Sequence, residues 1–314
     1  MKQRVLLGTL GFAVVVAFCG GLSINQEREV ILRYKFLVKE LRTYSFIGEM
    51  TITMQVMGQE VPTTISFFGE GTLTETHCIE DVDEDDMATI MTISKGQIKT
   101  RVIELPIGDE TSRQEEIPTI IIRFRVDQLG NIREKRFEKP KESLKSQMPL
   151  PLGLDLTAPQ MRSMIWEGLL LPKKPVRLGD SWDFTTEQTV NLGDRTVNVR
   201  EKYRAKLVGF EKVDERDCAV IEITSEIPDP SKFLKSAFPK EKGRVVSVRH
   251  KGQSNSKVWF DIANGLVAKS DETTEMMVNI KILTSTGQSL IMLVRGNSKF
   301  EQRLTKVVQA ENKE

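Results

Sequence analysis

The stretch VDEDDMATIMTIS at 82–94 recurs as VDERDCAVIEITS at 213–225. Seven of the thirteen positions are identical between the two copies. Both copies read as a charged turn followed by a strand, because polar residues cluster first and apolar residues then recur along the segment. The pattern predicts that one β-hairpin unit occurs twice in this chain.

A second pair of segments repeats in the same order. RFRVDQLGNIREK at 123–135 resembles KVWFDIANGLVAK at 257–269, and each reads as strand, aspartate, tight turn and strand. The aspartate side chain can accept hydrogen bonds from the backbone ahead of it, and Gly130 or Gly265 can adopt the positive φ that a hairpin needs. Two hairpins in the same order predict two related halves of the chain.

The rest of the chain supports a mainly β fold. Apolar and polar residues alternate in the segments 118–126, 195–210, 243–250 and 277–283, as expected for strands with one solvated face. Helical patterns are scarce, which favours antiparallel meanders over β-α-β units. One main helix is predicted near 158–170, after the capping residue Thr157 and before Pro172.

The expected organisation follows from these patterns. We predict a β-rich α+β protein with two related halves of curved antiparallel sheet. Its segments are a signal peptide or anchor at 1–23, a first β repeat at 27–137, a crossover with the helix at 138–171, a second β repeat at 172–305, and a polar tail at 306–314.

The N-terminus has the layout of an export signal. MKQR supplies two positive charges, and VLLGTLGFAVVVAF then runs without a charge before the small residues around Gly20. An uncleaved anchor and lipid attachment at Cys19 are the alternatives, although the bulky Phe18 before the cysteine disfavours lipidation. All three interpretations predict an extracytoplasmic protein that is secreted, periplasmic or anchored facing outward, with membrane contact only through this segment.

Charge and cysteine content limit the partners and the redox chemistry. Lys plus Arg number 45 and Asp plus Glu number 44, so the chain lacks the basic excess of a nucleic-acid binder. Cys78 and Cys218 follow the signal segment and occupy non-equivalent positions of the repeat. We expect them to be small buried apolar residues, while a disulfide between them remains open.

The segment LPKKPVRLGDSWDF at 171–184 carries the most specific motif. Two prolines extend the chain, Gly179 and Asp180 form a turn, and Trp182 enters a strand as an apolar anchor. The pattern LP-x-x-PV-x-x-GDSW resembles one in uncharacterised bacterial secreted proteins and lipoproteins, a family defined only as a domain of unknown function. The resemblance implies an envelope protein without an assigned activity, and it transfers no catalytic residue.

Candidate metal sites fail on spacing. Asp81, Asp83 and Asp85 alternate like the start of a calcium loop, but Asp86 stands where that loop needs glycine and Thr92 where it needs glutamate. We therefore interpret this run as a solvated hairpin tip. The two histidines, His77 and His250, have no neighbouring ligands at zinc spacing, even with Cys78 beside the first.

Candidate catalytic motifs fail as well. Ser254 and Lys257 match S-x-x-K by letters only, because the segment alternates like a strand and no K-T-G motif follows. No G-x-S-x-G motif and no glycine-rich phosphate loop occurs. We expect no catalytic, cofactor-binding or metal-binding residues and no cofactor, so that the protein is not an enzyme.

The methionines suggest a binding face. On the first strand, alternation places Met50, Ile52 and Met54 on one side, and Met57, Met87 and Met91 follow. Thioethers fill irregular cores, but they also line adaptable apolar pockets. The architecture resembles the half-barrels of lipoprotein carriers, which implies a non-catalytic envelope protein binding lipid or another apolar ligand on a concave sheet face. The alternative is a structural or protein-interaction module of the envelope with no small-molecule ligand.

Overall fold

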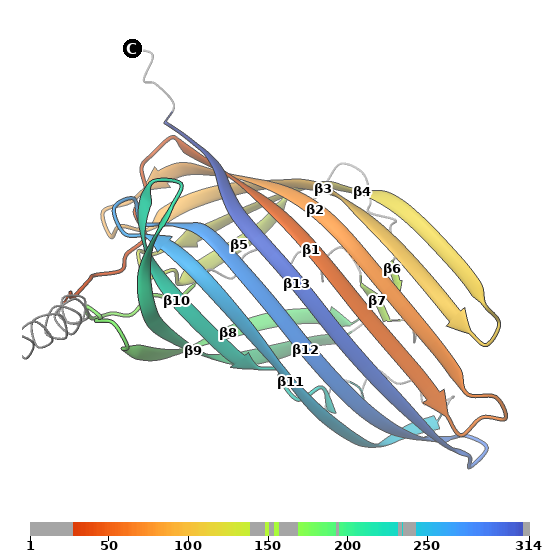
Figure 1. Cartoon of the computed structure of the whole chain (residues 1–314). Coiled ribbons are helices and arrows are strands. Elements are labelled where there is room, and N and C mark those ends of the chain that lie inside the picture. Colours follow the sequence, from red (N-terminus) through yellow and green to blue (C-terminus); the bar gives the residue numbers. More distant parts are fainter. Residues whose placement is uncertain are drawn as a thin grey trace, which may run out of the picture.

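The computed structural model describes residues 28–138, 148–150, 154–156, 169–192, 195–231, 234 and 243–309. Its main element is one antiparallel sheet of 11 strands, in the order β5-β4-β3-β2-β1-β13-β12-β11-β10-β9-β8. The predicted mainly β fold of curved antiparallel sheet is therefore confirmed (Figure 1). The predicted helix near 158–170 lies largely outside the described residues, as does the segment 1–23, and Leu169 and Leu170 are not helical.

The strands are long and follow one another in two meanders. The first meander contains β1 (Glu40–Met57), β2 (Thr63–Val82), β3 (Ala88–Leu105), β4 (Asp109–Val126) and β5 (Ile132–Glu138). The second contains β8 (Ser181–Leu192), β9 (Arg195–Val213), β10 (Arg216–Glu226), β11 (Gly243–Asp261), β12 (Leu266–Thr284) and β13 (Ser289–Gln309). A separate small pair is formed by β6 (Met148–Leu150) and β7 (Leu154–Leu156).

The first and last strands of the large sheet lie side by side at its centre. β1 pairs with β13 in register from Glu40 opposite Gln309 to Met57 opposite Ile291. Figure 1 shows this seam as the orange β1 next to the blue β13. β13 continues to Gln309, so the first four residues of the predicted polar tail belong to the sheet, where their backbone groups pair with those of β1.

The repeated segments occupy corresponding hairpins. The segment 82–94 contains the turn between β2 and β3, and the segment 213–225 contains the turn between β9 and β10. The two turns differ in length: 83–87 is a five-residue loop, whereas Asp214 and Glu215 form a two-residue loop with φ values of 46° and 68°. Two consecutive positive φ values are typical of a type I′ hairpin turn. A common origin of the halves stays a prediction, and none of the described strands of the first half corresponds to β13.

The second pair of repeated turns shows the predicted chemistry. Asp127 Oδ1 accepts hydrogen bonds from the backbone N–H groups of Leu129 and Asn131, each at 2.9 Å. Asp261 Oδ1 accepts one from the Asn264 N–H at 3.0 Å. Gly130 and Gly265 have φ values of 90° and 59°, so both turns use glycine where a side chain is disfavoured.

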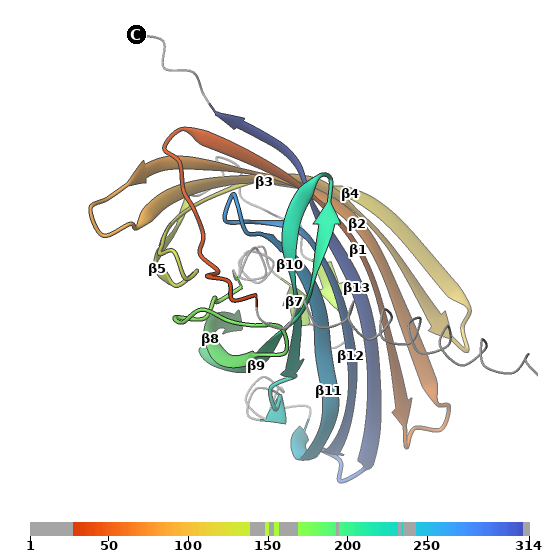
Figure 2. The same ribbon diagram turned by 60° about the vertical axis from the view of Figure 1, so that its left-hand side comes forward.

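Both of these turns also hold the segment 28–38, which precedes β1. The Tyr34 N–H donates to the Gln128 carbonyl at 2.8 Å, and the Lys35 N–H donates to the Gly265 carbonyl at 3.1 Å. Figure 2 shows this segment, drawn in red, on the concave side of the curved sheet. It therefore connects the two halves near one end of the strands.

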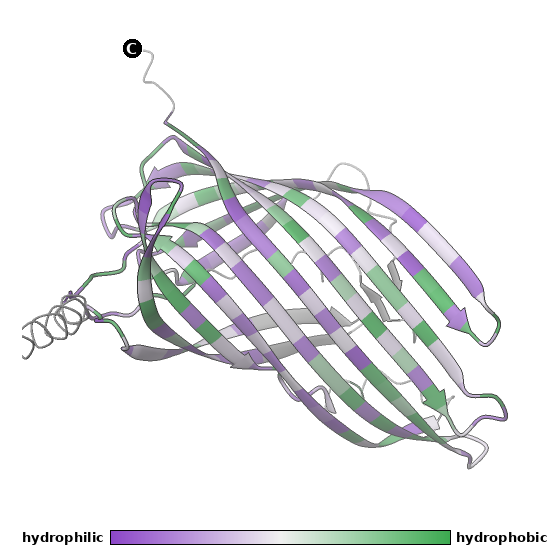
Figure 3. Cartoon of the chain, in the orientation of Figure 1, coloured by the Kyte–Doolittle hydropathy of each residue, from purple (hydrophilic) through white to green (hydrophobic). Residues whose placement is uncertain are grey.

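The two ends of the sheet are formed by different loops. We call the end that carries the loops 83–87, 127–131, 214–215 and 262–265 the acidic end. The opposite end carries the loops 58–62, 106–108 and 285–288 and the connection between β10 and β11, of which 227–231 is described, and we call it the apolar end. Figure 3 shows alternating hydrophilic and hydrophobic bands along the strands between these ends, as expected for a sheet whose two faces differ.

Candidate binding surface on the concave face

The concave face is filled at the acidic end. Leu32 and Tyr34 of the segment 28–38 and Leu171 of the segment 169–180 pack against sheet residues that include Leu207 and Phe260. The Tyr34 hydroxyl donates to the Leu169 carbonyl at 3.1 Å, and burial raises the pKa of Tyr34 above its usual range. This part of the face is a packed core.

The motif of 171–182 contributes to this core as a strand entry. Leu171 and Val176 are buried, and the Trp182 indole N–H donates to the Leu170 carbonyl at 2.8 Å. Gly179 has a φ of 92°, and the Asp180 carboxylate accepts from the Arg177 N–H at 2.8 Å. The Asp180 carboxylate thus stabilises the turn, whereas the Trp182 indole N–H holds the segment at Leu170.

A buried polar cluster lies next to this core on β1, β2 and β3. The Glu75 carboxylate accepts from the Ser94 hydroxyl at 3.1 Å and lies 3.2 Å from His77 Nε2. The Arg42 guanidinium pairs with the Glu40 carboxylate at 2.5 Å, and both side chains are buried. The Thr92 hydroxyl is buried without a hydrogen-bond partner among the described residues.

Sequence reasoning missed this cluster because its members come from three strands. Only the spacing of Glu75 and His77, two residues apart on one strand face, gave a signal. His77 and Cys78 are neighbours on β2 and therefore point to opposite faces of the sheet. The imidazole and the thiol considered as metal ligands in the sequence analysis thus lie apart. The part of the chain that the structure describes contains no group of three or more His, Cys, Asp or Glu residues placed to hold a metal ion.

The middle of the concave face carries small and polar residues. Gly48 lies opposite Gly71, and two ring carbons of Phe300 lie 2.6 Å from where a Cβ on Gly48 would be. The Glu272 carboxylate accepts from the Ser254 hydroxyl at 2.8 Å. This band thus combines glycine backbone, the Phe300 ring, the Ser254 hydroxyl and the Glu272 carboxylate, between the packed core and the apolar end.

The concave face is apolar toward the apolar end. We call this region the apolar wall, and its buried members come from β1, β12 and β13: Met54, Val278, Ile280, Ile282 and Met292. Partly buried hydrophobic residues extend it: Val56, Ile65, Val245, Val248, Met276, Leu290 and Val294. Of the described hydrophobic residues outside the sheet, Leu234 packs against this wall.

The predicted methionine face is part of this surface. Met50, Ile52 and Met54 lie on one face of β1, and Met54 joins the apolar wall. Met57 is exposed at the end of β1, and the Met91 sulfur accepts from the Arg123 guanidinium at 3.4 Å. The five methionines considered in the sequence analysis thus do not form one cluster. The sequence analysis missed Met276 and Met292, whose signal was their alternation with aliphatic residues on β12 and β13.

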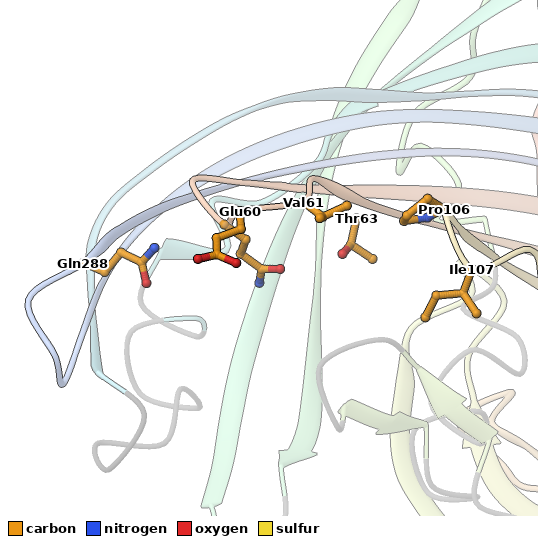
Figure 4. Close-up of a pocket in the computed structure, with 7 residues that line it drawn as sticks. Glu60, Val61, Thr63, Pro106, Ile107 and Gln288 are labelled. Carbon is orange, nitrogen blue, oxygen red and sulfur yellow. The ribbon is translucent and has the colours of Figure 1, made fainter.

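A shallow, open pocket lies at the mouth of the concave face. It has a volume of about 640 Å³ and is lined by residues of three loops and adjoining strands: Gln59, Glu60, Val61, Thr63, Pro106, Ile107 and Gln288 (Figure 4). This volume is in the range of small-molecule sites, while the lining mixes polar and apolar side chains. The Gln288 amide donates to the Gly58 carbonyl at 2.7 Å and thereby links two of the loops.

The remaining candidates have structural partners. Asp83 Oδ1 accepts from the Asp85 and Met87 N–H groups, each at 3.0 Å, and Asp83 Oδ2 pairs with Arg125. These hydrogen bonds, the one from Met87 first, hold the pKa of Asp83 below its usual range. Ser254 and Lys257 are three residues apart on β11 and so point to opposite faces.

Cys78 and Cys218 are both free thiols. Cys218 is buried with Val220, Trp259 and Ala268, whereas Cys78 is half-buried on β2. The strands β1, β13, β12 and β11 lie between them in the sheet. Because these four strands separate Cys78 from Cys218, the two thiols cannot form a disulfide. The expected burial is confirmed for Cys218 only.

Comparison with known proteins gives two distant likenesses. No protein-family model and no curated protein matches the chain. A solved structure on lipid–protein interactions in lipovitellin superposes with a TM-score of 0.41 and 10% identity, covering 89% of this chain and 26% of that one. Pseudomonas aeruginosa OccK7 (OpdD) superposes with a TM-score of 0.27 and 7% identity, covering 82% and 99%.

This chain thus spans about a quarter of the lipovitellin chain (26%). Within the described residues, no helix has the length and apolar character needed to cross a membrane. At these scores neither likeness assigns a function to this chain.

Proposed function

We propose that this protein is a non-catalytic envelope protein that binds a lipid or another apolar ligand along the apolar wall. The observation that carries the proposal is the arrangement of the wall itself. Aliphatic and methionine side chains from neighbouring strands face one side of the sheet, at the end where that side opens into the pocket. A continuous apolar strip of this kind suits a flexible hydrocarbon chain, which gains affinity from removal of apolar surface from water.

The composition of the wall favours an adaptable ligand site. Met54 and Met292 belong to the wall and Met276 borders it, and their unbranched side chains can repack around chains of different shape. Above the wall, the carboxylate of Glu272 and the hydroxyl of Ser254 give a hydrogen-bonding band. We therefore expect a ligand with a hydrocarbon tail toward the apolar end and a hydrogen-bonding head group without net negative charge at this band.

We further propose that the protein is extracytoplasmic and that it belongs with the secreted proteins that share the motif of 171–182. The export-signal layout of residues 1–23 supports this location. Mass spectrometry of the mature N-terminus tests it. Cleavage near residue 23, or lipid on Cys19, supports export, whereas an intact cytoplasmic chain contradicts it.

Ligand binding is tested first on the purified protein. We expect organic extraction followed by mass spectrometry to release a co-purifying lipid. A fluorescent apolar probe, N-phenyl-1-naphthylamine, should bind the extracted protein and be displaced by fatty acid.

A pair of variants locates the site. Gly296 lies on the concave face of β13, where the nearest atom to an added Cβ is the terminal methyl of Met276 at 3.3 Å. Gly296→Phe should fill the strip beside the wall and lower probe affinity about tenfold or more, because the aromatic ring occupies the space of the chain. Asn297→Phe adds the same ring to the exposed opposite face of the same strand and should leave affinity unchanged.

The outcomes separate this function from its alternative. Equal loss in both variants places the probe elsewhere and contradicts the proposal. Absence of both a co-purified lipid and probe binding supports a structural or protein-interaction module of the envelope instead.

A further inference from the structure

The concave side of the central strands carries one charged side chain between the packed core and the apolar end. By alternation, the concave positions of β12 in 270–284 and of β13 in 290–304 contain Glu272 and no Lys or Arg. The concave positions of β1 in 44–56 contain no charged residue. Glu272 is therefore an isolated negative charge on this part of the sheet.

Hydroxyl groups orient the Glu272 carboxylate without neutralising it. Its Oε1 atom accepts hydrogen bonds from the Ser254 hydroxyl at 2.8 Å and from the Thr274 hydroxyl at 3.4 Å. Asp271, on the other face of β12, pairs with Lys269 at 2.9 Å, whereas no described Lys, Arg or His pairs with Glu272. Glu272 is half-buried, and a partly desolvated carboxylate is stabilised by a cation beside it.

An aromatic ring lies beside this carboxylate. Phe300 is directly opposite Glu272 in the pairing of β12 with β13, and side chains in such positions have Cβ atoms about 5 Å apart. The Phe300 ring extends over Gly48 of β1, on the other side of β13 from Glu272. Phe300 is 45% exposed, and Gly71 continues the same row on β2 without a side chain. The ring and the carboxylate are therefore both open to a ligand on the concave face.

We propose that Glu272 and Phe300 form a binding site for a positively charged amine, the head group of the bound apolar ligand. The carboxylate supplies the opposite charge, and the face of an aromatic ring attracts a cation. The hydroxyl oxygens of Ser254 and Thr274 beside the carboxylate can accept further hydrogen bonds from an ammonium group. An anionic head group would be repelled by Glu272, and a neutral one would leave its charge unpaired.

This site rests on the proposed function, because the same ligand must also occupy the apolar wall. Met276, which borders the wall, follows Glu272 by four residues on the same strand face, about 13 Å along β12. Gly296 lies opposite Met276 and adds no side chain to the path between them. A hydrocarbon chain attached to an amine at Glu272 therefore reaches the wall along the concave face.

The test compares single-chain ligands that share one chain length and differ in head-group charge: dodecylamine, dodecan-1-ol and dodecanoate. Each competes with N-phenyl-1-naphthylamine for the purified, lipid-extracted protein, below the concentration at which it forms micelles. We expect dodecylamine to bind about tenfold more tightly than dodecan-1-ol, because a hydrogen bond between two ionised groups is stronger than one to a neutral hydroxyl. Dodecanoate should bind more weakly than either.

Three variants locate the site. Glu272→Gln removes the charge at nearly constant size and should abolish the preference for dodecylamine over dodecan-1-ol. Glu275→Gln makes the same change on the exposed opposite face of β12 and should keep the preference. Phe300→Leu keeps an apolar side chain but removes the ring, so it should weaken binding of dodecyltrimethylammonium about threefold and leave that of dodecan-1-ol unchanged.

Other results overturn the inference. Equal affinity of the wild type for dodecylamine and dodecan-1-ol would indicate an uncharged head group, and this comparison needs no variant. A preference that survives in Glu272→Gln, or that is lost equally in Glu275→Gln, would exclude this site. Probe binding without a preference for the amine thus refutes the amine site alone, whereas failure to bind the probe and all three ligands refutes the proposed function together with it.

Discussion

Replacing Gly265 by alanine tests how the segment before β1 is held against the sheet. A Cβ at this position would lie 2.5 Å from the Arg33 carbonyl oxygen and 2.5 Å from the Lys35 backbone nitrogen. Both neighbours are backbone atoms, so no side-chain rotation can relieve the contact. The turn or the segment must move, and the hydrogen bond from the Lys35 N–H to the Gly265 carbonyl is lost with it.

The expected loss has two parts that a second glycine separates. Gly287 has a φ of 82°, and an added Cβ would have no atom within 4 Å. Gly287→Ala should therefore cost only the left-handed backbone conformation, about 1 kcal/mol of unfolding free energy. Gly265→Ala should cost that amount plus a hydrogen bond and the disturbed packing of the segment, about 3 kcal/mol in total.

Urea unfolding followed by tryptophan fluorescence measures both losses. Trypsin gives an independent readout, because Arg33 and Lys35 lie in the displaced segment and should be cleaved faster in Gly265→Ala than in Gly287→Ala. Equal unfolding free energies for the two variants, with equal cleavage rates, would refute the close approach of the segment to this turn.

Three further predictions follow from buried groups. Burial raises the pKa of Tyr44 to about 12, above the value near 10 in the unfolded chain. The contribution of the buried hydroxyl to the free energy of unfolding is therefore complete below pH 10. It is lost as the pH rises toward 12, because the unfolded chain releases this proton first. Tyr44→Phe should remove about 2–3 kcal/mol of that alkaline loss in urea unfolding, and an unchanged alkaline slope would contradict it. Burial raises the pKa of both thiols, that of Cys218 to about 11; because Cys218 is also buried and Cys78 only half-buried, iodoacetamide should modify Cys78 faster in the native protein, as peptide mapping can check. Glu75→Ala removes the acceptor of two buried hydrogen bonds and should cost about 3 kcal/mol in thermal unfolding, whereas Glu75→Gln should cost less.

The sequence was most informative where chemistry is local. The turns at Asp127–Gly130 and Asp261–Gly265 were predictable because an aspartate cap and a positive φ act within a few residues. Strand alternation alone predicted that Met50 and Met54 lie on the same face of the sheet. These features need no knowledge of the neighbouring strands.

Features that depend on strand order were not predictable. The Glu75 cluster forms because β1, β2 and β3 are neighbours, and the apolar wall forms because β1 meets β13. No local pattern in 289–309 indicates that this strand pairs with the first one. For the same reason the residues 306–309 look like a polar tail, although their backbone lies opposite β1.

The pairing of β1 with β13 has a consequence for biogenesis. The residues of β1 leave the ribosome first among the sheet residues, and the strand that completes their hydrogen bonding leaves last. Pairing at the central seam must therefore wait until β13 has been made, which makes it slow and leaves the open edge of β1 available for wrong pairing in the meantime. A chain that is truncated before β13 should accumulate as aggregates, since its first meander keeps an open inner edge.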